Sequence, residues 1–80
     1  MPPPLELHGH ATALTTAGRR RRRVFLHVGA RSILLVGTAS LLDALPLGPE
    51  HRLVVAGGWV VEEHVFAVCR FRAAGRGDDA

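Results

Sequence analysis

Apolar residues alternate with other residues along most of this chain, and this period of two constrains its fold more than any other feature. The clearest segment is LELHGHATAL, residues 5–14, in which small and apolar side chains occupy every second position. Alternate side chains of a β-strand point to opposite faces, so we expect one face of this segment to be buried. The residues predicted on that face are Leu5, Leu7, Gly9, Ala11 and Ala13.

Four further segments read as strands: RVFLHVG, SILLVG, HRLVVAGGWVVEE and HVFAVCRFR. Turn regions separate them, and the first of these, TTAGRRRR, has Gly18 near its expected tip. Gly9 within the first strand and Gly57–Gly58 within the fourth predict a bend or a bulge. In RVFLHVG, one side carries Val24, Leu26 and Val28 and the other carries Phe25 and His27.

The periodicity changes in TASLLDALPLG, where leucines follow a helical spacing. Ser40 precedes Asp43 by three residues, which is the spacing of a capping box at the start of a helix. Pro46 ends the helical pattern, and Gly48-Pro49 turns the chain. We therefore predict one short helix over residues 40–45, with Ser40 as its cap.

The predicted order of three strands, a helix and two strands is that of the oligonucleotide/oligosaccharide-binding (OB) fold. We therefore expect a mainly β protein, a five-stranded OB-like barrel with one short helix between strands three and four. The segment EHRLVVAGGWVVEEHVFAVCRF resembles the closing hairpin of small bacterial OB-fold proteins. An SH3-like or Sm-like barrel is the alternative, and it lacks a helix at this place. Whether SLLDAL is helical separates the two folds.

A chain of 80 residues is long enough for one domain with one small core. We assign residues 5–73 to the barrel. Residues 1–4, MPPP, and residues 74–80 are small, charged or proline-rich, and both ends are expected to be disordered.

Five consecutive arginines, half of the ten basic residues, occupy the expected loop between the first two strands and the start of the second. In an OB-fold, this loop, the loop between strands four and five, and the face of strands two and three bind the ligand. A basic loop beside that face suits the nucleic-acid backbone, single-stranded DNA or RNA above all. Two alternatives stay open: a contact with an acidic protein partner, and a solvated patch without a partner. The predicted binding residues are Arg19, Arg20, Arg21, Arg22, Arg23, Phe25, His27, Arg31 and Arg52.

Aromatic residues make up only 5% of the chain, so stacking platforms for bases are scarce. Double-stranded or structured nucleic acid, held mainly through its phosphates, therefore stays open as a ligand. Phe25 and His27 share a strand face and form the one small platform that the pattern predicts. A second core face or a homodimer contact is the competing explanation for Phe25.

The sequence indicates no enzyme, because it contains no carboxylate pair, phosphate loop or catalytic triad order. We expect no cofactor and no metal, since His8 and His10 lie two apart on one strand without a third ligand. The single cysteine, Cys69, is expected to act as a small hydrophobe within its strand, and it fits a reducing cytoplasm. Arg31 interrupts the apolar stretch after the arginine run, which argues against a membrane-spanning segment.

Overall fold

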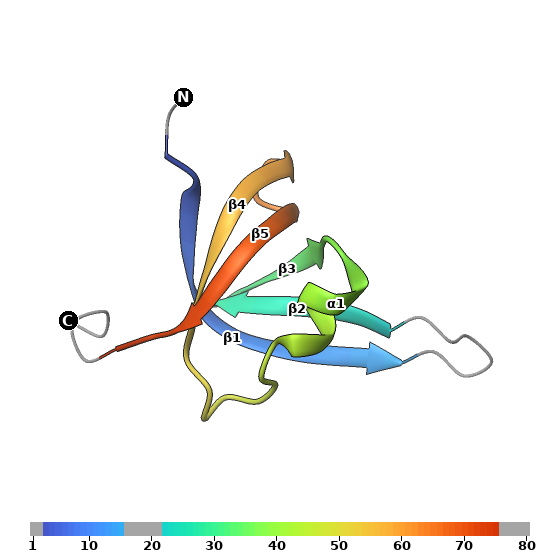
Figure 1. Ribbon diagram of the computed structural model, residues 1–80, viewed down its shortest axis with the longest axis vertical. Helices are drawn as coiled ribbons and strands as arrows, with labels where there is room; N and C mark the ends of the chain where they lie inside the picture. The colour runs from blue at the N-terminus through green and yellow to red at the C-terminus, as the bar shows by residue number, and fades with distance from the viewer. Residues whose placement is uncertain (1–2, 16–21, 76–80) are drawn as a thin grey trace.

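The computed structural model describes residues 3–15 and 22–75 and forms a closed five-stranded β-barrel (Figure 1). Its elements are β1 (Leu5–Thr15), β2 (Arg22–Val28), β3 (Arg31–Val36), α1 (Ala39–Ala44), β4 (Leu53–Val61) and β5 (Val65–Ala73). Around the barrel the strand order is β1-β2-β3-β5-β4, and β4 returns to β1. All neighbours are antiparallel except β3 and β5, which are parallel. The predicted mainly β barrel with a helix between the third and fourth strands is confirmed.

The long strand β1 closes the barrel by pairing with a different neighbour along each half of its length. Leu5 to Gly9 pair with β4, and His10 to Thr15 pair with β2. Gly9, predicted as a bend, lies at this exchange of partners. A Cβ atom at Gly9 would overlap the backbone carbonyl oxygen of His27, so a residue larger than glycine cannot keep this close approach.

The glycine pair in β4 lies at a bulge, as predicted. Ala56 is opposite Arg70 of β5, whereas Gly57 is opposite Val68, so Cys69 is the extra residue of the bulge. Here the sequence-based expectation for the cysteine is wrong. Cys69 is exposed, because Phe66 and Val68 point into the barrel and the alternation along β5 turns the next residue to the outside.

The core lies inside the barrel and is entirely aliphatic apart from Phe66. Trp59 packs on Phe66 in an edge-to-face arrangement, with the ring centroids 5.2 Å apart. The helix α1 lies between β3 and β4 in the chain, and its leucines Leu41 and Leu42 pack against the core. Buried core residues are Ala11, Val24, Leu26, Ile33, Leu35, Leu45, Leu53, Val55, Phe66 and Val68.

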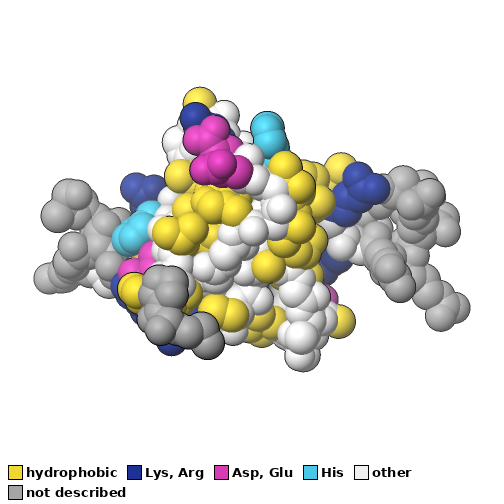
Figure 2. Space-filling model, turned by 90° about the horizontal axis from the view of Figure 1, so that it is seen from above, with side chains coloured by type: hydrophobic (Ala, Val, Ile, Leu, Met, Phe, Trp, Pro, Cys, Tyr) yellow, Lys and Arg dark blue, Asp and Glu magenta, His cyan; other side chains and the backbone are white. Residues whose placement is uncertain are grey.

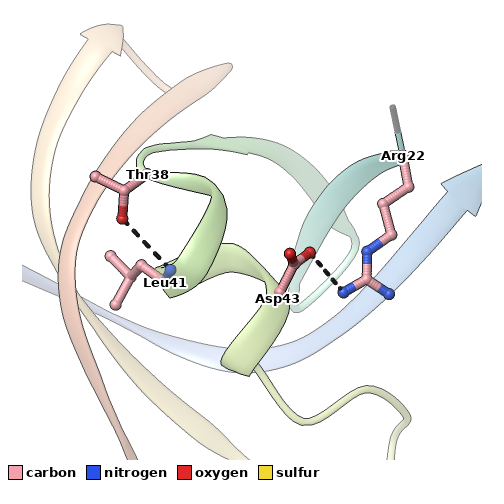
Figure 3. A network of polar contacts seen from close by, with 4 residues as sticks. All are labelled: Arg22, Thr38, Leu41 and Asp43. Atoms are coloured by element: carbon pink, nitrogen blue, oxygen red, sulfur yellow. Dashed lines mark hydrogen bonds and ion pairs between the residues drawn. The ribbon is translucent and has the colours of Figure 1, made fainter. Parts of the chain in front are cut away.

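The cap of α1 differs from the sequence-based prediction. The helix begins at Ala39, and the side chain of Thr38 accepts a hydrogen bond from the backbone N–H of Leu41 at 3.4 Å (Figure 3). Ser40 is therefore a residue within the first turn and not the cap. Asp43 does not complete a capping box, because the third residue after the Thr38 cap is Leu41. The carboxylate of Asp43 pairs with Arg22 instead.

Replacing Thr38 or Ser40 with alanine should change the free energy of unfolding in different ways. Thr38→Ala should destabilise the protein by about 0.5–1 kcal/mol, because the helix loses the acceptor for an otherwise unpaired N–H. Ser40→Ala should leave the free energy of unfolding unchanged or raise it slightly, because alanine is the better helix former. Urea unfolding of both variants measures the difference, and a larger loss for Ser40→Ala would contradict the cap assignment.

Candidate functional site

The outward side chains of β1, β2 and β3 form two adjacent rows across the barrel. In the first row the register places His10 opposite His27, and His27 opposite Ser32. In the second row Thr12 lies opposite Phe25, and Phe25 opposite Leu34. We call these six residues the outer face. Phe25 and His27 share it, as the alternation predicts, and both are half-buried.

His27 is held in place on this face by three side chains. Its Nε2 hydrogen-bonds to Thr12 Oγ1 at 2.7 Å, and its Nδ1 hydrogen-bonds to Ser32 Oγ at 3.1 Å. The ring of His10 stacks on it with a centroid distance of 4.9 Å and an interplanar angle of 25°. Both ring nitrogens of His27 are thus engaged within the protein, and its ring can meet a ligand through its flat surface rather than through its nitrogens.

Sequence reasoning placed His10 with His8 and left Thr12 and Ser32 out of the site. In the barrel, His8 pairs with β4 and His10 with β2, because β1 changes partner between them. No group of three or more metal-ligating side chains forms among residues 3–15 and 22–75. The sequence alone does not reveal the register of the β1–β2 pair, which brings His10 and Thr12 beside β2.

Five of the seven predicted arginines belong to the arginine run, and the other two, Arg31 and Arg52, lie at the start of β3 and directly before β4. Arg19, Arg20 and Arg21 lie outside the described residues, and so does Gly18. Arg22 and Arg23 are the first residues of β2 and are exposed. Arg23 lies opposite Leu14, whose exposure is 59%.

Two of the predicted arginines form ion pairs at opposite ends of the β2–β3 hairpin. Arg22 Nη2 donates to Asp43 Oδ1 of α1 at 3.1 Å (Figure 3). Arg31 Nη1 lies 2.7 Å from Glu63 Oε1, in the turn between β4 and β5. Arg22 begins β2 and Arg31 begins β3, and the two strands are antiparallel. The outer face therefore lies between two arginines that already have a carboxylate partner.

The Arg31–Glu63 pair also changes the protonation equilibria of its members. The hydrogen bond from Arg31 and its positive charge hold the pKa of Glu63 below its usual value. The same contacts raise the pKa of Arg31. A carboxyl group whose pKa is lowered by folding stabilises the folded state above its unfolded-state pKa, and that contribution is lost as the pH falls through the folded-state pKa. The pair is thus formed at neutral pH and is lost only in acid.

Arg52, the last predicted binding residue, lies directly before β4. Leu53, the next residue, pairs with Gly9 of β1, and the backbone carbonyl of Arg52 accepts a hydrogen bond from Ala74 at 2.9 Å. Because Gly9 and His10 are consecutive on β1, this register brings Arg52 to the His10 end of the first row. Along the strand direction, Arg31 and the backbone of Arg52 therefore lie toward one end of the outer face, on different strands, and Arg22 and Arg23 lie toward the other end.

Large apolar side chains are also exposed outside the two rows, both next to the outer face and elsewhere on the barrel. Viewed from above, hydrophobic side chains cover much of the visible surface, and the arginine side chains of the described residues lie at its margins (Figure 2). The exposed large hydrophobic residues are Leu5, Leu14, Val60 and Val61.

Comparison with known proteins supplies no assignment for this chain: no family model, curated protein or solved structure matches it. Within the part of the chain that the structure describes, no helix has the length and apolar character needed to cross a membrane.

Proposed function

We propose that this protein is an OB-like module that binds single-stranded DNA or RNA across its outer face. The closed five-stranded barrel with α1 between β3 and β4 is compatible with an OB-like fold. In OB-folds, strands two and three and the adjoining loops form the ligand surface. One observation carries the proposal. The ring of Phe25 and the stacked rings of His10 and His27 lie in neighbouring rows of one face, with arginines at both ends.

Each part of the face has a chemical role in this proposal. Bases stack on the ring surfaces of Phe25 and of the imidazole pair, which is a sequence-tolerant interaction because every base has a flat face. Arg23 and the arginines at residues 19–21 contact phosphates and release counterions. The hydroxyls of Thr12 and Ser32 orient His27.

A protein-interaction module is the second candidate function. Leu14, exposed beside Arg23, favours it, because an apolar side chain next to a basic group suits an acidic protein surface. Exposed aliphatic side chains at Leu5 and Val60 would also suit a contact between two copies of this chain, and a homodimer stays an untested alternative.

A fluorescence anisotropy titration against single-stranded DNA, duplex DNA and RNA at two salt concentrations tests the main proposal. We expect binding to single strands that weakens as salt rises. Absence of binding to all three probes at low salt would reject the nucleic-acid function. Retention of an acidic protein by the parent but not by an arginine-loop variant would then support the second candidate.

Phe25→Ala should weaken binding to single strands by about 1–3 kcal/mol, the usual contribution of one base–aromatic stack. The slope of log affinity against log salt should stay the same, because stacking releases few counterions. The matched control is Val60→Ala, which shortens an exposed apolar side chain outside the outer face. Equal losses in the two variants would contradict the role of Phe25 in stacking.

A further inference from the structure

Two carboxylates, Asp43 and Glu63, form ion pairs with the arginines Arg22 and Arg31 at the two ends of the outer face. Both ion pairs are exposed, with the Glu63 side chain 58% and the Asp43 side chain 67% accessible to solvent. Each pair joins a strand of the outer face to a different element, α1 in one case and the β4–β5 turn in the other. Neither carboxylate contributes to the core.

We propose that Asp43 and Glu63 make the outer face selective for single strands over duplex by competing with phosphates for Arg22 and Arg31. This inference rests on the proposed function and assigns the two acidic residues a role in specificity.

The selectivity follows from how the two ligands bind. A duplex carries its phosphates at twice the axial density of a single strand and keeps its bases stacked inside, so it relies on phosphate contacts. A single strand can stack its bases on Phe25 and the imidazole pair and needs fewer arginines. The ion pairs that already engage Arg22 and Arg31 therefore lower the affinity for a duplex more than they lower the affinity for a single strand.

The competition is weak enough to be measured as a change in affinity rather than as all-or-none binding. Exposed ion pairs of this kind change an equilibrium by up to about five-fold. Phosphate also accepts two parallel hydrogen bonds from a guanidinium, so a ligand can replace the carboxylate.

The test compares Glu63→Gln with Glu62→Gln in the full-length protein. Both variants remove one negative charge from the same turn, but Glu62 forms no ion pair with another described residue. Affinities for a single-stranded and a duplex DNA of the same sequence are measured at two salt concentrations. Thermal unfolding confirms that both variants fold.

We expect Glu63→Gln to raise duplex affinity by about two- to five-fold and single-strand affinity by less, with Glu62→Gln giving a smaller change for both probes. Asp43→Asn should act in the same direction. The gain in duplex affinity should disappear in the double variant Glu63→Gln/Arg31→Ala, because that gain comes from the Arg31 guanidinium that Glu63→Gln frees.

Equal gains from Glu62→Gln and Glu63→Gln would overturn the inference, since they would report net charge alone. Unchanged duplex affinity in Glu63→Gln, with the parent still binding single strands, would overturn it and leave the proposed function in place. A parent that binds neither probe would overturn both.

Discussion

Gly57→Ala is expected to destabilise the barrel severely. A Cβ atom at this position would overlap the backbone carbonyl oxygen of Ala67 on β5 and approach the ring of Phe66. The clash is with backbone, so one of the two paired strands has to move. We expect a loss of at least about 3 kcal/mol, a large part of the total stability of a domain of this size.

Gly58→Ala is the matched control in the next residue. No atom outside its immediate chain neighbours lies within 4 Å of a Cβ built at Gly58. The variant should keep its melting temperature or gain slightly, because alanine reduces the conformational freedom of the unfolded chain. Gly9→Val should behave like Gly57→Ala, since its side chain would meet the carbonyl of His27. A melting temperature within a few degrees of the parent for Gly57→Ala would disprove the close approach.

Replacing Arg19, Arg20 and Arg21 together with alanine should cause the largest loss of nucleic-acid binding. Each arginine that neutralises a phosphate contributes about 0.7 to the salt slope on single strands, so the slope should fall by about 2. At about 50 mM salt this corresponds to an affinity loss on the order of 100-fold, similar for all sequences. The variant keeps Arg22, so the ion pair with Asp43 is preserved and the fold should survive.

Arg70→Ala controls for a general effect of positive charge. Arg70 is exposed on β5 opposite Ala56, away from the outer face. Its removal should leave the salt slope almost unchanged. A triple variant with the parent's slope would show that these three arginines do not contact phosphates.

Period-two alternation was sufficient to predict five strands, the shared face of Phe25 and His27, and the special positions of Gly9 and Gly57–Gly58. These properties are local, because the direction of a side chain and the conformations open to glycine depend on a few adjacent residues. The helix was also predicted, but its cap was assigned two residues too late. A serine followed three residues later by an acidic residue suggests a helix cap wherever this pair occurs in a sequence. Thr38 is the cap because it directly precedes Ala39, the first helical residue.

Only the closed barrel decided which residues meet across the chain. The stack of His10 on His27, the hydrogen bonds of Thr12 and Ser32, and the two ion pairs of Arg22 and Arg31 all depend on strand register. Alternation specifies which face a side chain occupies but not its neighbour on the next strand. The exposure of Arg70 has the same origin. Phe66 and Val68 point into the barrel, so strict alternation would point Arg70 inward, but the bulge between β4 and β5 shifts the pattern and Phe71 packs on the core instead.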